Sequence, residues 1–179
     1  MRTLRALASC SVVLVACNAD PVHDDRVDAL GKEAPGVPPG PLHRPGQPCL
    51  LCHDGRGPGN DEFSVAGTVY QFKDSDVPLS DAIVLLLDSR TCPPTKPDCN
   101  RFATATNCAG NFFVDSHDFA PVRPMWVSLV YGGIAVPMSS PMFRTGSCAD
   151  CHHDPPSSDS VGHVYFAPTT IPFPPSGCP

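Results

Sequence analysis

The chain has 179 residues, of which 41% are hydrophobic; this is enough for one globular domain with extensions and argues against a wholly disordered protein. The formal net charge is −6 with only 12 Lys and Arg, so the basic patch needed to contact a phosphate backbone is missing and nucleic acid is not an expected partner. Proline is frequent, at 23 residues, and because it removes a backbone donor and fixes φ, long helices are not expected.

The first 16 residues have the features of an export signal. A short positively charged start precedes an apolar stretch, 6–16, that is too short to span a bilayer as a helix. The end of this stretch, Leu14-Val15-Ala16-Cys17, resembles the bacterial lipobox. The resemblance implies a lipoprotein signal peptide over 1–16 and a lipid anchor on Cys17. The alternative is an ordinary signal peptide cut near the same place, with Cys17 left as a thiol or in a disulfide.

Residues 17–48 are polar and then rich in proline and glycine, without helical or strand periodicity. This composition predicts a disordered, semi-extended tether between the lipid anchor and a folded body. Residues 168–179 are again rich in proline and are expected to lie extended over the domain.

Between 63 and 140 the pattern changes to short apolar runs bounded by Gly, Pro, Asn and Asp, which is typical of strands. Six strands are predicted, at 63–70, 82–87, 101–106, 111–115, 126–131 and 134–138. Because no helical pattern separates them, the expected fold class is mainly β: a small antiparallel β-sandwich over 63–140, flanked by irregular segments.

Three pieces of this region, Gly67-Thr68-Val69, residues 78–85, and residues 104–107 leading to 110–112, resemble the carboxypeptidase regulatory-like domain with its transthyretin-like β-sandwich. The sequence departs from the family pattern in two places. Asp81 stands where the family usually has glycine, and the loop 91–100 is longer. The resemblance implies a scaffold and supplies no catalytic activity.

Two five-residue motifs flank the predicted sandwich, Cys49-Leu50-Leu51-Cys52-His53 and Cys148-Ala149-Asp150-Cys151-His152. In each, two thiols three positions apart can form thioethers with the vinyl groups of a c-type haem, while the next histidine binds the iron. Ten cysteines and seven histidines placed at random give only about 0.02 such motifs per chain. We therefore expect two haem c groups, held by segments 49–62 and 141–179. Their attachment sites are Cys49, Cys52, Cys148 and Cys151, and their proximal iron ligands are His53 and His152.

Three other uses of these motifs are open. Two Cys-x-x-Cys pairs can build a zinc site, although such pairs are usually closer in sequence. Simple disulfides would leave both histidines unexplained. A thioredoxin-like redox pair needs a βαβ context that the strand pattern does not offer.

The remaining cysteines fit an oxidising compartment. After Cys10 in the signal, Cys17 as anchor and the four motif cysteines are set aside, four remain: Cys92, Cys99, Cys108 and Cys178. This even number fits two disulfides. Cys92 with Cys99 and Cys108 with Cys178 is one of three possible connectivities.

The second axial ligand of each iron is a separate question. His43, six residues before Cys49, is the first candidate for the first iron. For the second iron the candidates are Met142, Met138 and His163, with His153 last because it directly follows His152 and would have difficulty reaching the opposite face of the ring. Iron bound by two histidines has a lower potential than iron bound by His and Met, so the choice sets the direction of electron flow.

The whole arrangement resembles the multihaem c-type cytochromes of bacterial envelopes. The resemblance implies an electron carrier, rather than an enzyme, that exchanges electrons with redox partner proteins of the envelope. It would be an exported lipoprotein, held to a membrane by its lipid anchor, in the periplasm or on the outer membrane of a Gram-negative bacterium. Two alternatives remain: a binding or adhesion lipoprotein whose motifs are zinc or disulfide staples, and a haem enzyme similar to a peroxidase.

Overall fold

The structure is a computed structural model that describes residues 20–91, 101–167, 173 and 177–178. The chain divides into two compact units, Met1–Gly31 and Lys32–Pro179. Within the described residues no helix has the length and apolar character needed to cross a membrane. The predicted signal peptide, the predicted lipid anchor Cys17, and the loop cysteines Cys92 and Cys99 lie outside the described residues.

The described part of the first unit contains the helix α2 (Pro21–Ala29), where the sequence predicted a disordered tether. The Asp20 carboxylate caps this helix by accepting from the backbone N–H of His23 at 3.1 Å. Pro21 lies in the first turn, where a backbone N–H has no partner within the helix, so its missing N–H costs no hydrogen bond. Apolar periodicity does not reveal α2, because its few apolar residues do not gather on one face.

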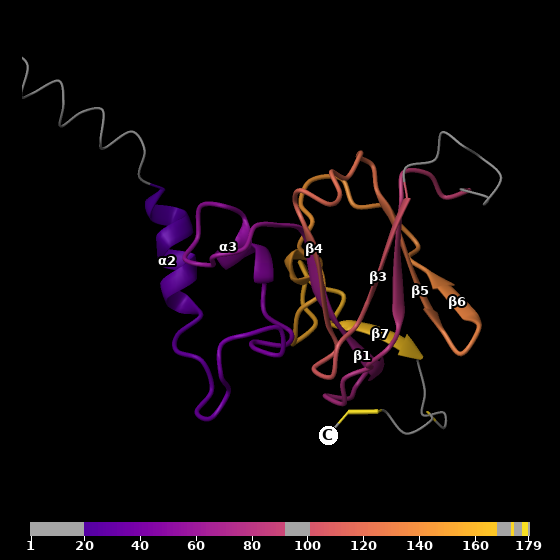
Figure 1. The fold of residues 1–179 in the computed structure, drawn as a ribbon, viewed down its shortest axis with the longest axis horizontal. Helices are drawn as coiled ribbons and strands as arrows, with labels where there is room; N and C mark the ends of the chain where they lie inside the picture. Colours follow the sequence, from indigo (N-terminus) through magenta and orange to yellow (C-terminus); the bar gives the residue numbers. More distant parts are fainter. Residues whose placement is uncertain (1–19, 92–100, 168–172, 174–176, 179) are drawn as a thin grey trace, which may run out of the picture. The chain divides into compact units, whose positions relative to one another are not determined.

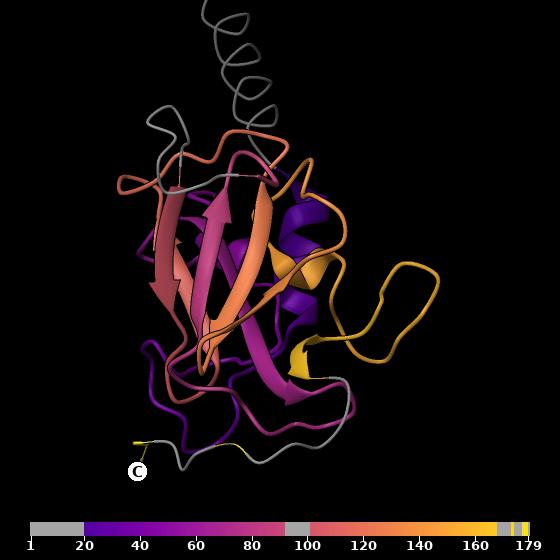
Figure 2. The same cartoon turned by 90° about the vertical axis from the view of Figure 1, so that its right-hand side faces the viewer.

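The second unit is a two-layer β-sandwich, which confirms the predicted mainly-β fold class (Figure 1). One sheet has three strands in the order β4-β1-β7, and the other has four in the order β3-β2-β5-β6. The strands are β1 (Phe63–Phe72), β2 (Ile83–Leu87), β3 (Arg101–Ala105), β4 (Asn111–Asp115), β5 (Trp126–Tyr131), β6 (Ile134–Pro137) and β7 (Val164–Ala167). Figure 2 looks onto the four-stranded sheet.

Six of these strands are the predicted ones, and β7 is an addition from the segment assigned to the second haem motif. All pairs are antiparallel except one: β7 runs parallel to β1, with Val69 opposite Val164 and Phe72 opposite Ala167. The sandwich therefore extends beyond residue 140 and is not purely antiparallel.

The hydrophobic core lies between the two sheets. Alternate residues of β1 and β4 face it, and the four-stranded sheet adds its own inward side chains. Its most deeply buried members are Val65, Val69, Leu79, Val84, Leu86, Phe112, Val114 and Met125. The outward residues of β1 and β4 form a second surface, on which the chain before β1 lies.

Asp81 adopts a left-handed backbone conformation, with φ of 61°. Glycine reaches this region without steric cost, whereas a residue with a Cβ reaches it less easily. Asp81 thus stands at a position where the backbone favours glycine.

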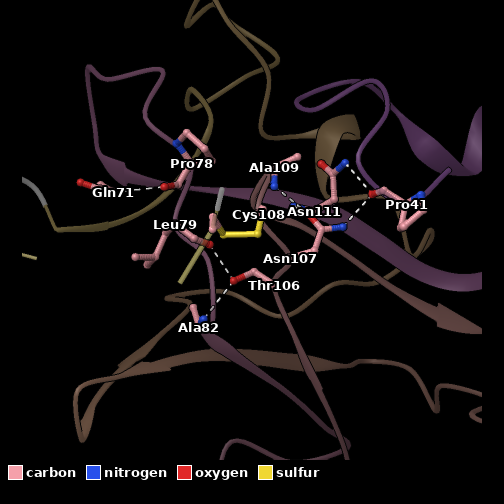
Figure 3. The surroundings of a disulfide bond; sticks show 11 residues. Pro41, Gln71, Pro78, Leu79, Ala82, Thr106, Asn107, Cys108, Ala109 and Asn111 are labelled. Atoms are coloured by element: carbon pink, nitrogen blue, oxygen red, sulfur yellow. Dashed lines mark hydrogen bonds between the residues drawn. A yellow bond between two sulfur atoms is a disulfide. The ribbon is translucent and has the colours of Figure 1, made fainter. Parts of the chain in front are cut away.

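Cys108 and Cys178 form a disulfide that joins the turn before β4 to the end of the chain (Figure 3). This is one of the pairings that the cysteine count left open. The bond links Cys178 to a residue 70 positions earlier in the sequence, and the extended course predicted for residues 168–179 falls mostly outside the described residues.

Candidate functional site

The first motif forms the short helix α3 (Cys49–His53), which packs against β1. After His53 the chain turns back, because the Asp54 carboxylate accepts from the backbone N–H groups of Arg56 and Gly57 at 2.9 and 3.3 Å. Burial raises the pKa of Asp54, but these bonds and the ion pair with Arg56 outweigh it and lower the pKa below its ordinary value. The returning chain donates from Gly59 N–H to the carbonyl of Cys52 at 2.8 Å.

The same loop fixes the His53 ring. Its Nδ1 lies 2.8 Å from the carbonyl oxygen of Asp61, which can only accept, so Nδ1 carries the proton and Nε2 keeps its lone pair. A side chain at Gly59 would collide with this imidazole, so a glycine is needed for the close approach. Metal-binding histidines commonly donate their second ring nitrogen to a backbone carbonyl in this way.

Aromatic rings surround His53 on the outer face of the three-stranded sheet. Its ring centroid is 4.5 Å from that of Phe63 on β1, and Phe63 lies 4.8 Å from Phe113 on β4. The His43 ring is 5.9 Å from the His53 ring, with 24° between the two planes. The structure thus brings together a predicted proximal ligand and its predicted distal partner.

The second motif begins in the 3₁₀ helix η1 (Cys148–Asp150), at the edge of β1 opposite β4. Ala66 of β1 donates its N–H to the carbonyl of Gly146 at 3.0 Å and forms an isolated bridge with Ser147. Cys148 then enters the core against Gly67, where an added Cβ would lie 2.7 Å from the Cys148 Cβ and 2.8 Å from its Sγ. Only a glycine lets the motif approach the strand so closely.

The loop after the second motif repeats the arrangement seen at the first. Val161 N–H donates to the carbonyl of Cys151 at 3.1 Å, as Gly59 does to Cys52. The Nδ1 of His152 lies 3.0 Å from the Gly162 carbonyl, so here too Nδ1 carries the proton. Burial lowers the pKa of His152, with a further contribution from His163, and this outweighs the hydrogen bond to Gly162. The neutral ring, which is the form that binds metals, is therefore favoured.

A cavity of about 970 Å³ opens beside the second motif. Cys148, Cys151 and His152 line it together with the two candidate ligands Met138 and Met142, and apolar side chains of β5 and β6 form one wall. Its volume stands at the upper end of the roughly 300–1,000 Å³ typical of small-molecule and cofactor sites.

The four motif cysteines are free thiols in the structure, and their exposure differs. Burial raises the pKa of Cys49 to about 11 and that of Cys148 to about 12. The two motifs share one strand as their support. Strand β1 brings them together, since both α3 and η1 pack against it.

Compared with protein-family models, with curated proteins and with solved structures, this chain gives no match. The chemistry of the site is therefore argued from its own geometry.

The donor set fits a haem attached at each motif. Each motif offers two free thiols and an imidazole whose Nε2 has no hydrogen bond to any described residue, and the second also borders an apolar cavity. Within the residues that the structure describes, no group of three or more His, Cys, Asp or Glu side chains is placed to hold a metal ion. The zinc alternative would need such a group.

The candidate second ligands have different surroundings. Met138 and Met142 line the cavity beside His152. His163 is buried, and both of its ring nitrogens are occupied: Nδ1 lies 2.6 Å from Asp154 Oδ2 and Nε2 lies 2.9 Å from the carbonyl oxygen of Phe72. Iron binding by His163 would break one of these bonds, so the structure favours a structural role for it. No sequence signal showed this, because one partner is a backbone carbonyl on β1.

Proposed function

We propose that this protein is a covalent dihaem c-type cytochrome that carries electrons in the bacterial cell envelope. The observation that carries the proposal is the repeated local arrangement at the two motifs. In both, the loop after the histidine returns to donate a backbone N–H to the second cysteine's carbonyl, and the histidine Nδ1 donates to a carbonyl of that loop. Two segments far apart in the sequence thus prepare an imidazole in the same way.

When bound, haem supplies one-electron chemistry, and the chain's own residues supply attachment, orientation and burial. Cys49 and Cys52 would attach one group, and Cys148 and Cys151 the other. His53 and His152 would each present Nε2 to an iron, held in the correct tautomer by the carbonyls of Asp61 and Gly162. These bonds also make the imidazoles stronger donors.

The proposal also includes the cellular location of the protein and its redox partners. The lipobox-like residues that end at Cys17 support an exported, lipid-anchored protein in the periplasm or on the outer membrane of a Gram-negative bacterium. Redox partner proteins of the envelope would give and take the electrons. The shared strand supports transfer between the two groups within one molecule, because it keeps both motifs close together.

The test is expression of the full chain together with a bacterial haem-maturation system, followed by purification from membranes. We expect a sharp c-type α-band in the reduced-minus-oxidised spectrum, two haems per chain by haem assay, and a mass that includes two haems and the acyl chains. A colourless product whose four motif cysteines are still alkylated after reduction would refute the proposal.

Paired substitutions at each motif show which motif holds which haem. Cys52→Ser with His53→Ala and, separately, Cys151→Ser with His152→Ala should each reduce the haem content from two to one. Cys108→Ser serves as a control cysteine change outside the motifs and should keep both haems. A zinc or disulfide staple predicts no haem in any of these proteins. Rapid turnover of peroxide by the wild type would instead support the haem enzyme.

A further inference from the structure

The outer face of the four-stranded sheet is apolar. Strand β2 buries Val84 and Leu86 in the core, and directly opposed residues of antiparallel strands share a face, so the strand register identifies the outward side chains. Apart from Arg101 and Ser128 they are all apolar: Ile83, Leu85, Leu87, Ala103, Ala105, Trp126, Val130, Ala135 and Pro137. Figure 2 shows this face toward the viewer, with no other described element of the second unit in front of it.

This composition is unusual for the outer side of a sandwich. An antiparallel sheet that packs one face on a core commonly turns polar residues to water on the other. Here Ile83 is 38% exposed although β2 lies inside the sheet, between β3 and β5, and the outward alanines of β3 and β6 are exposed too. A contiguous apolar surface of this kind marks an interaction site.

Charged residues stand at the two ends of this face, and their signs are opposite. The Arg90 guanidinium carbon lies 5.4 Å from the centroid of the Trp126 ring, at the end where β2 finishes, and Arg101 is at the same end. Asp81 is exposed just before the start of β2, at the other end. The surface therefore has a positive end, an apolar centre and a negative end.

Such a surface is complementary to a copy of itself. Rotation by 180° about an axis that lies in the interface and crosses the strands brings the Arg90 end of each copy over the Asp81 end of the other, with the apolar centres in contact. An axis along the strands would instead collect the like charges of both copies at the same end, which is unfavourable. A uniformly charged surface, such as an anionic membrane, would attract only one end.

The size of the face sets the strength of this contact. Four strands about 4.8 Å apart, with five residues of about 3.4 Å each, cover roughly 320 Å². Stable interfaces bury about 800 Å² on each partner, so the sheet alone supports a weak dimer that dissociates in the micromolar range.

We propose that the outer face of the four-stranded sheet is a docking surface for a second copy of this chain, in a two-fold dimer that places Arg90 of each copy over Asp81 of the other. Both motifs pack against β1, in the opposite sheet, so the dimer would not cover them. The inference goes beyond the proposed function, because none of these contacts needs a haem.

The test is photo-crosslinking of the full chain in bacterial membranes. With p-benzoylphenylalanine in place of Ile83, irradiation should give a product of twice the chain's mass, identified by denaturing electrophoresis and peptide mass spectrometry. Phe113 is the matched control site, since it is 39% exposed but lies on β4, in the opposite sheet. The same crosslinker in place of Phe113 should give no such product.

Variants test the apolar centre and the charges separately. Leu85→Lys should reduce the yield of the doubled product at Ile83 at least tenfold, because it buries a charge in the centre of the contact. Arg90→Glu and Asp81→Lys should each reduce it roughly fivefold, since each change removes two symmetry-related surface ion pairs. The two changes together should restore the yield. Far-UV circular dichroism and haem content, measured on every variant, show whether the chain still folds and carries its haems.

The outcomes decide the proposal. Absence of a doubled product at Ile83, or equal yields at Ile83 and Phe113, would overturn it. Cross-links at Ile83 to a different protein, or to lipid alone, would assign the face to another occupant and would overturn it as well. A doubled product that Leu85→Lys abolishes but the charge swap does not restore would overturn the two-fold arrangement and leave the dimer.

Discussion

Replacement of His163 distinguishes a structural histidine from an iron ligand. The buried ring donates to the Asp154 carboxylate and to the Phe72 carbonyl and lies 4.4 Å from the Tyr70 ring. The bond to the carbonyl contributes about 1 kcal/mol, and the charged bond adds about 1.5 kcal/mol, at the lower end of its range because Asp154 is half exposed and water can replace the ring. Loss of the aromatic contact adds about 0.5 kcal/mol.

His163→Leu should therefore lower the free energy of unfolding by roughly 3 kcal/mol, measured by urea titration followed by far-UV circular dichroism. His163→Gln keeps one amide donor and should lose about half as much. His117→Leu, at a side chain that is 87% exposed, should leave the stability unchanged within error. In the haem-loaded protein none of the three should alter the spectrum. A high-spin signal or new CO binding in His163→Leu would show that His163 binds iron.

Four other predictions concern the cysteines. Gly67→Ala should lower the free energy of unfolding by about 1–3 kcal/mol in urea, because its Cβ would lie 2.7 Å from that of Cys148, and an unchanged value would contradict the close approach. In a chain made without haem, iodoacetamide at pH 8 should label the exposed Cys151 before the buried Cys148, as judged by peptide mass spectrometry, whereas equal rates would contradict the burial. In the same haem-free chain, burial raises the pKa of Cys148 from an ordinary value of 9.0 to about 12, so the free energy of unfolding in urea should fall as pH rises between these values. Removing the disulfide by Cys108→Ala with Cys178→Ala should cost about 2–4 kcal/mol in thermal or urea unfolding, and a loss below about 1 kcal/mol would contradict its role in closing a 70-residue loop.

Local sequence patterns predict most of the fold, because short apolar runs bounded by Gly, Pro, Asn and Asp mark all the strands except β7. β7 does not follow this pattern. It is four residues long, stands beside a proline-rich tail, and pairs in parallel with the distant β1, so its stability comes from non-local contacts. α2 left a weak signal in Asp20 and Pro21, which act as cap and first residue, but it lacks the apolar face that identifies a helix.

Within the site, the spacing of Cys49, Cys52 and His53 indicates the chemistry and says nothing of the geometry. The carbonyls of Asp61 and Gly162 orient the two histidines, and a backbone carbonyl leaves no trace in residue identity. Asn107 lies between two predicted strands, and its contact with Pro41 crosses 66 positions of sequence. Contacts of this range depend on the assembled sheet.

The placement of both motifs on β1 has a mechanical consequence. This strand is hydrogen-bonded along both edges, to β4 on one side and to β7 and Ser147 on the other. Movement of one motif relative to the other would require β1 to bend, and the hydrogen bonds along both of its edges oppose such bending. Insertions in the surface loops should therefore leave the spacing of the two motifs unchanged.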